Sequence, residues 1–128
     1  MRQSARSVSL VAITAAIAIM TAVLGGCSEL APPSGEPSIR GPVTSITPGS
    51  NGLGIILVEE TAPQGLDYDK GALTITKDTV LLKRVGDDYA ELAFDDLSTG
   101  TPVEVWITGA VAESYPIQAA ADTVVALE

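Results

Sequence analysis

A single cysteine, Cys27, ends an uncharged apolar segment and divides the chain into a leader and a part that can fold. Arg2 and Arg6 precede this segment, whose apolar centre extends over residues 8–24. A basic start, an apolar centre and small residues at the end are typical of a cleaved export signal. The apolar centre is shorter than the roughly 20 residues that a transmembrane helix needs. We therefore expect residues 1–26 to be a cleaved, helical signal peptide.

The residues just before the cysteine match a bacterial lipobox. Leu24 supplies a branched apolar side chain, and Gly25 and Gly26 supply the two small residues that fit the groove of a signal peptidase. The pattern predicts lipidation at Cys27, with the palmitate-type acyl anchor of a lipoprotein, and an extracytoplasmic position on the bacterial cell membrane. The alternative is a plain secretory signal in which Cys27 is incidental.

The composition excludes several classes of function. The chain has no His and one Cys, which removes His-based catalytic triads, internal disulfides and cysteine clusters for zinc. Loss of the leader with its two arginines moves the formal charge from −9 to −11, because all 16 acidic residues follow it. Phosphate contacts need a basic face, so we expect no nucleic-acid partner. We also expect no cofactor and no metal.

Residues 28–37 are rich in proline, small residues and acidic residues. Such a segment buries too little apolar surface to fold, and its prolines favour extended conformations. The prediction is a disordered tether over residues 27–37 that begins with the lipidated Cys27. At about 3.1 Å per residue it would lift the domain roughly 30 Å from the membrane. The globular domain is then expected over residues 38–128.

The pattern of that domain is typical of strands. Apolar or alternating runs are separated by turn clusters rich in Gly, Pro, Asn and Asp, and they occupy residues 39–47, 53–60, 72–76, 79–85, 101–109 and 122–127. Residues 89–97 fit either a short strand or a helical turn. In the clearest strand, residues 101–109, Val103 and Val105 share one face and Glu104 and Trp106 the other. We predict an all-β fold, a small antiparallel barrel of five or six strands, because closure protects strand edges.

The C-terminal third resembles a known family. Residues 96–106 and 109–119, and above all the segment Glu113-Ser114-Tyr115-Pro116 followed by Gln118, are similar to the YobA-type domain of unknown function. That family consists of small bacterial secreted or lipid-anchored proteins with an OB-like barrel. The resemblance extends over residues 38–127 and implies an OB-like fold and an envelope location. It implies no active site, because the family has no assigned reaction.

Four residues form the candidate binding rim, namely Glu113, Tyr115, Gln118 and Trp106. Pro116 restricts Tyr115 to extended geometry, so this segment is expected at a barrel rim, where polar side chains can meet a ligand. The structural alternative has Tyr115 closing the end of the barrel. Trp106 is either a stacking platform or a packed core residue. The structural interpretation is favoured for both aromatic residues.

The acidic residues occur largely in pairs, such as Asp67 with Asp69 and Asp95 with Asp96. Alternate carboxylates before Gly71 fit a calcium loop poorly, because further ligands and the terminal Glu are missing. Two carboxylates across a cleft would suit a glycosidase. Solvated turn acids are the simpler interpretation.

Nucleophilic catalysis has no evident machinery, because Ser114 lacks a His to activate it. We therefore expect a monomeric, non-catalytic, membrane-anchored module that binds an envelope protein, an envelope polymer or a small ligand. The alternatives are a carboxylate-dependent hydrolase of an envelope polysaccharide and a structural spacer.

Overall fold

The computed structural model describes residues 30–127, so Cys27 and the expected signal peptide lie outside the described residues. The described chain is all-β, as the sequence predicts. It contains one short 3-10 helix, η1 (Phe94–Asp96), and nine strands, which are β1 (Ile39–Pro48), β2 (Gly54–Glu59), β3 (Lys70–Ile75), β4 (Val80–Val85), β5 (Asp88–Glu91), β6 (Pro102–Trp106), β7 (Val111–Ala112), β8 (Ile117–Ala120) and β9 (Thr123–Ala126). Within these residues, no helix has the length and hydropathy required to span a bilayer.

The first hairpin follows directly from its turn residues. Asn51 and Gly52 both have a positive φ, at 56° and 73°, which Gly and Asn adopt most readily. The Gly49 amide donates to the Leu53 carbonyl at 2.7 Å and closes the turn. The hairpin between β1 and β2 that the turn cluster at residues 48–52 predicts is therefore confirmed.

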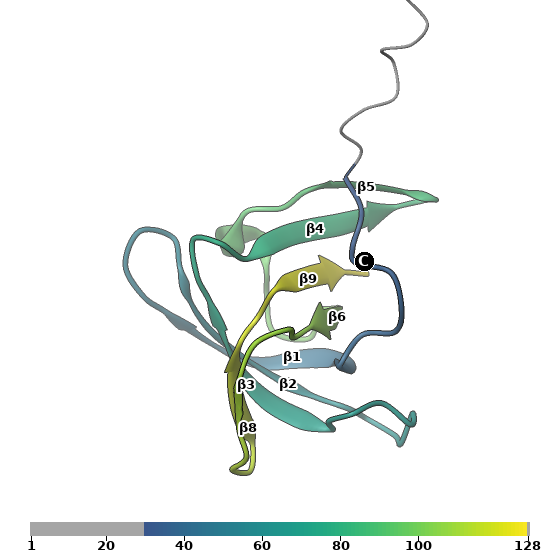
Figure 1. The fold of residues 1–128 in the computed structure, drawn as a ribbon. Helices are drawn as coiled ribbons and strands as arrows, with labels where there is room; N and C mark the ends of the chain where they lie inside the picture. Colours follow the sequence, from purple (N-terminus) through teal and green to yellow (C-terminus); the bar gives the residue numbers. More distant parts are fainter. Residues whose placement is uncertain (1–29, 128) are drawn as a thin grey trace, which may run out of the picture.

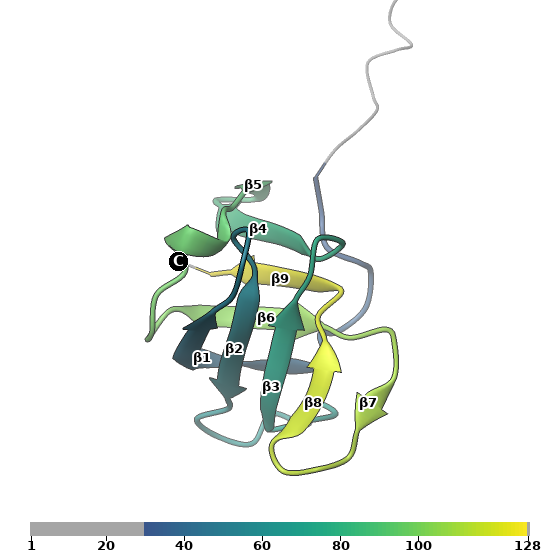
Figure 2. The ribbon, with the colours of Figure 1, turned by 90° about the vertical axis from the view of Figure 1, so that its left-hand side faces the viewer.

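The nine strands form one sheet that bends into two layers. Its order is β5-β4-β9-β6-β1-β2-β3-β8-β7, and we call β5 to β1 half A and β1 to β7 half B. The long strand β1 belongs to both halves, because residues 39–42 pair with β6 and residues 43–48 pair with β2. The register shifts between Val43 and Ser45, where a bulge bends the strand. In Figure 2, strands β4, β9 and β6 run across the direction of β2, β3 and β8.

The expected antiparallel barrel of five or six strands is not confirmed. The sheet has nine strands and does not close, since β5 and β7 are its two edges. It is also mixed, because β3 pairs with β8 and β4 pairs with β9 in parallel. The two parallel pairs have one cause. Strands β3 and β8 are neighbours in half B, and each continues into half A, where the following strands β4 and β9 are again neighbours. The Ala121 amide donates to Thr74 and the Val80 amide to Asp122 at this corner.

The main core lies between the two halves. It is built from the inward side chains of both layers together with Phe94 and Leu97 beside η1. Its fully buried members come from five strands and are Ile39, Val43, Ile56, Val58, Leu73, Val103, Val105 and Val124. The alternation predicted for residues 101–109 is confirmed, because Val103 and Val105 face this core and Trp106 does not.

A second, smaller cluster covers the outer face of half A. Leu82, Trp106 and Val125 are buried there, with Tyr89 and Leu127 packed against them. The described part of the predicted tether, residues 30–37, descends past β4 and β9 on this side of the molecule (Figure 1). We call residues 30–37 the strap. They lie on the domain, whereas their composition predicts a free tether.

Candidate functional site

Trp106 is a packed residue and not an exposed platform. Its side chain is 8% exposed and belongs to the outer cluster of half A. The indole N–H donates to the Gly35 carbonyl of the strap at 3.3 Å. An indole buried with its polar atom satisfied is the common arrangement for tryptophan in a small domain. The structural interpretation of Trp106 is therefore confirmed.

A charged group beside Trp106 was not among the expected site residues. Glu104 is buried on the same face of β6, and its Oε2 accepts from Arg40 Nε and forms an ion pair with Arg40 Nη2, each at 2.9 Å. Arg84 Nη2 lies 3.6 Å from Oε1 of Glu104. A buried carboxylate needs such partners. The sequence contains a signal for this burial, because Glu104 stands between two core valines and shares a strand face with Trp106.

Tyr115 lies on the surface, and the expectation that it closes the end of a barrel is wrong. Its side chain is 69% exposed. The hydroxyl donates to the carboxylate of Asp69 at 3.2 Å, which joins the segment between β7 and β8 to the loop before β3. Lys70 Nζ lies 5.7 Å from the centre of the tyrosine ring and 3.9 Å from Glu59. The ring is thus held in one place although water reaches most of it.

The environment of Tyr115 is negatively charged. Partial desolvation, the hydrogen bond to Asp69 and the charges of Asp69, Glu59 and Glu60 raise the pKa of the Tyr115 hydroxyl above 10. Neighbouring carboxylates oppose formation of a phenolate. Tyr115 therefore keeps its proton, and the hydrogen bond that depends on it, throughout the neutral range.

Gln118 and Ser114 complete this surface. The Ser114 hydroxyl donates to the Pro116 carbonyl at 2.8 Å and accepts from the Gln118 amide at 3.4 Å, so the segment before β8 is fastened by its own side chains. We define the Tyr115 surface by its exposed or half-buried polar residues, which are Glu59, Asp69, Lys70, Ser114, Tyr115 and Gln118.

The expected rim is therefore only partly assembled. Glu113 is exposed in the same segment as Tyr115 and Gln118. Trp106 lies apart from these three, in the outer cluster of half A and under the strap. Asp69 and Lys70 were not expected at the rim, because only the tertiary fold places the loop before β3 beside the segment before β8.

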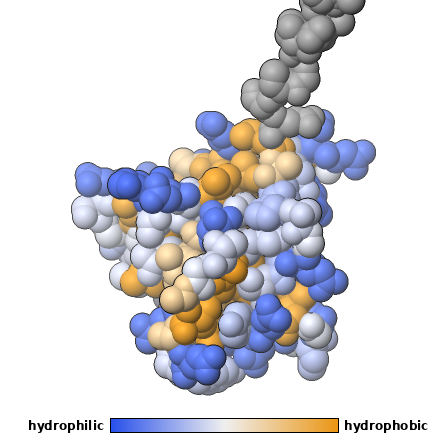
Figure 3. Space-filling view, viewed as in Figure 1, coloured by the Kyte–Doolittle hydropathy of each residue, from blue (hydrophilic) through white to orange (hydrophobic). Residues whose placement is uncertain are grey.

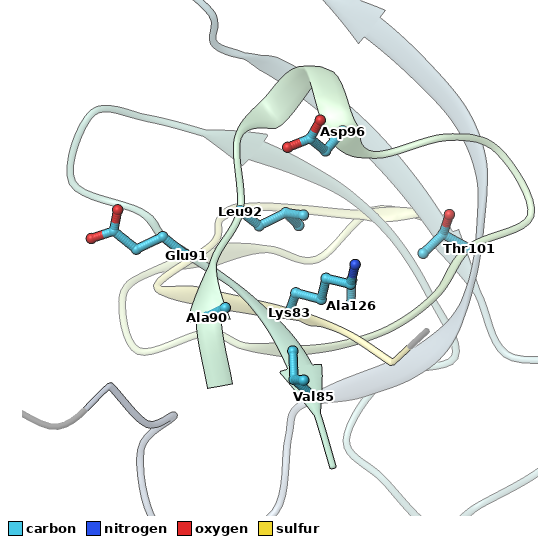
Figure 4. A pocket seen from close by; sticks show the side chains of 8 residues that line it. All are labelled: Lys83, Val85, Ala90, Glu91, Leu92, Asp96, Thr101 and Ala126. Carbon is cyan, nitrogen blue, oxygen red and sulfur yellow. The ribbon is translucent and has the colours of Figure 1, made fainter. Parts of the chain in front are cut away.

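A hollow of about 600 Å³ opens between the β4–β5 hairpin and η1. Lys83, Val85 and Ala90 line it from the hairpin, and Ala126 lines it from β9. In Figure 4, Lys83 occupies the middle of the view, and Glu91 points away from it. Lys83 shares the inward face of β4 with Leu81, which packs against the core. Lys83 and Val85 follow Leu81 on this face and are both exposed, so the hairpin extends beyond the core here.

The acidic pairs form no metal-binding group among the described residues. Among residues 30–127, no three His, Cys, Asp or Glu side chains lie close enough to hold a metal ion. Asp96 accepts from the Ala93 amide at 3.3 Å, which is a local turn contact of the kind that acidic residues commonly make. Glu59 accepts from the Thr44 hydroxyl at 3.0 Å.

A family model for a protein of unknown function, DUF3221, matches residues 55–128. The chain belongs to the DUF3221 family. Neither a curated protein nor a solved structure matches it.

The DUF3221 match contains the whole Tyr115 surface and all residues that line the hollow. Strand β1 and the strap precede it, although β1 is the strand that joins the two halves of the sheet. The DUF3221 domain of this chain therefore uses a preceding strand to complete its core.

Proposed function

We propose that this chain is a bacterial lipoprotein whose DUF3221 domain is a monomeric, non-catalytic binding module outside the cytoplasm. Acylation of Cys27 would hold it on the membrane, and the Tyr115 surface would bind an envelope protein, an envelope polymer or a small ligand. The proposal includes kinship with the YobA-type proteins. Their OB-like architecture is compatible with a strongly bent sheet around one core, although this sheet has two open edges.

The observation that carries the proposal is the state of Tyr115. A large aromatic side chain that is 69% exposed contributes little to the core, yet its hydroxyl is fixed by Asp69 and its ring is flanked by Lys70. Exposed tyrosines that are already ordered lose little conformational entropy on binding and are common at interfaces. Ser114 and Gln118 add further donors and acceptors beside the ring.

The alternative functions receive less support. A carboxylate-dependent hydrolase needs two acids that face one bound sugar. Glu91 and Asp96 both line the hollow, but Glu91 points away from Lys83 in Figure 4 and Asp96 accepts from the Ala93 amide. A purely structural spacer has no need of a fixed, exposed aromatic ring.

Photo-crosslinking in intact cells tests the binding role. A benzophenone amino acid placed at position 115 of the full-length chain should give a discrete, light-dependent adduct. The matched control is the same amino acid at Ile55, which is 42% exposed on the outer face of half B. Equal labelling at both positions, or none at either, would contradict the proposal. Mass analysis of the N-terminal peptide tests acylation of Cys27 separately.

A further inference from the structure

The strap is attached to half A at several points. Leu30 lines a small hollow with Val80, Leu82 and Leu92, and is only 41% exposed. The Gly35 carbonyl accepts from the Trp106 indole, and Pro37 is buried. These contacts lie at the start and at the end of the described segment, while most residues between them are exposed. Two prolines, Pro32 and Pro33, limit the number of conformations that the strap must lose to make them.

The attachment leaves little free chain between the domain and the predicted anchor. Only three peptide units separate Cys27 from Leu30. A fully extended chain spans at most about 3.3–3.6 Å per residue, so Leu30 can lie no more than roughly 11 Å from the Cα atom of Cys27. A free tether over residues 27–37 would allow about three times that distance.

The chain enters the domain at the end opposite the Tyr115 surface. In Figures 1 and 2, which share a vertical axis, the strap begins at the top beside β4 and β5. The loop before β3 and the loop between β7 and β8 lie at the bottom in both views. These two loops carry Asp69 and Tyr115, which are hydrogen-bonded to each other.

Apolar side chains lie beside the entry of the strap at the top of the molecule in Figure 3, and also over its lower middle. The difference between the two ends is therefore one of charge and not of hydropathy. Leu30 and Val80 are among the exposed large apolar residues. At the other end, Glu59, Glu60 and Asp69 lie close enough to Tyr115 to raise the pKa of its hydroxyl. The β4–β5 hairpin at the opposite end also carries three acids, but Lys83 and Arg84 offset them in part. An anionic membrane surface would therefore repel the Tyr115 end more strongly.

We infer that the strap holds the domain close to the membrane in one orientation, with the Leu30 and Val80 face next to the lipid and the Tyr115 surface pointing away. This inference rests on the proposed acylation of Cys27. It narrows the partner class, because a surface that points away from the bilayer meets a soluble or polymeric component of the envelope and not a lipid. The strap acts as a spacer of fixed length and direction.

Fluorescence quenching on vesicles tests the orientation. The full-length lipidated chain is placed in phosphatidylethanolamine and phosphatidylglycerol vesicles whose headgroups carry a nitroxide quencher. One fluorophore is attached through Val80→Cys, and in a second sample through Glu113→Cys, since acylation makes Cys27 unreactive. We expect quenching at position 80 to exceed that at position 113 several-fold. Equal quenching at both positions would overturn the inference.

Two controls separate the orientation from the anchor. Twelve Gly and Ser residues inserted between Ser28 and Glu29 should reduce quenching at position 80 to the level at position 113. An unchanged difference after the insertion would show that the orientation does not depend on the short chain between Cys27 and Leu30, and would also overturn the inference. Flotation with the vesicles, compared with Cys27→Ser, reports the anchor itself. A native chain that fails to float contradicts both the anchor and the orientation.

Discussion

The two halves of the sheet differ in how their outer faces are covered. In half A, all four residues of β9 are buried, and four of the five residues of β6 are buried. In half B, buried and less buried residues alternate along β3, and Ile55 of β2 is 42% exposed. The strap and the outer cluster around Trp106 make this difference, since they lie on half A only among the described residues.

This difference teaches that apolar pattern alone does not reveal how many faces of a strand are covered. Val124 and Val125 are consecutive and face opposite sides, yet both are fully buried. Ile55 and Ile56 are also consecutive, but only Ile56 is buried. Both runs read as buried strands in the sequence. What distinguishes them is the outer cluster over Val125, whose Trp106 is in turn bonded to the strap.

The largest expected effect concerns the outer cluster. Trp106→Ala should lower the free energy of unfolding by about 3–5 kcal/mol, because it leaves a cavity under the strap. Ile55→Ala, on the uncovered face of half B, should lower it by less than about 1 kcal/mol. Urea denaturation followed by circular dichroism measures both. Similar losses would mean that the outer faces of the two halves are covered equally.

The ion pairs of half A give the next effect. Arg40→Ala should cost about 2 kcal/mol, because Glu104 stays buried with only Arg84 to compensate its charge. The comparison is Lys77→Ala, which removes a largely exposed pair with Asp78 and should change stability by less than about 0.5 kcal/mol. Thermal unfolding at low and at high salt distinguishes them. If Lys77→Ala lowered the stability as much as Arg40→Ala, the buried ion pair would contribute no more than the exposed one.

A smaller effect is expected where the strap begins. Leu30→Gly should lower the free energy of unfolding by about 1 kcal/mol, since the side chain is only partly withdrawn from water. The emission of Trp106 should shift to longer wavelength if loss of Leu30 loosens the cover over the indole. The control is Val85→Ala, which truncates another exposed apolar side chain of half A. Alanine is used there because a glycine within a strand is itself unfavourable. An unchanged stability in Leu30→Gly would show that the strap begins to hold only nearer Gly35.

The smallest effect on stability is expected at Tyr115. Tyr115→Phe and Tyr115→Ala should each change the melting temperature little, because the ring is largely exposed. A substantial decrease in either variant would restore the structural interpretation and make the end of half B part of the core.

The titration of Tyr115 tests the hydrogen bond between its hydroxyl and Asp69. The raised pKa means that the neutral hydroxyl keeps its bond to Asp69 below pH 10 and loses it as the pH rises through the raised value. Asp69→Asn should bring the pKa back toward 10. Nuclear magnetic resonance of the ring carbons measures this titration, and comparison with Tyr115→Phe assigns the signals of Tyr115. An unchanged pKa in Asp69→Asn would contradict the assigned contact.

Local signals predicted much of the fold. The turn at Asn51 and Gly52, the alternation around Val105 and the last strand are all present. The ambiguity of residues 89–97 also has a structural basis, because the segment ends strand β5 and then forms helix η1. These features depend on neighbours in the sequence, and their periodicity is visible there.

The sheet topology and half of the candidate site could not be predicted in this way. The parallel pairing of β3 with β8 joins Leu73 to Ala119, and β7 is only two residues long, so neither leaves a local pattern. The partners of Tyr115, Asp69 in the loop before β3 and Lys70 at its start, have no local pattern for the same reason. The burial of Trp106 was predictable from its size and apolarity. The contacts of Tyr115 depend instead on where the loop before β3 meets the segment between β7 and β8.

The position of β9 has a consequence for when this chain can fold. The strand occupies residues 123–126, yet it lies in the interior of half A, between β4 and β6. A chain that is synthesised from its N-terminus therefore exposes β4 and β6 before the strand that separates them is made. Long-range pairings of this kind also slow folding. Half A is thus completed only after residues 123–126 are available, and the strap has no finished surface to lie on until then.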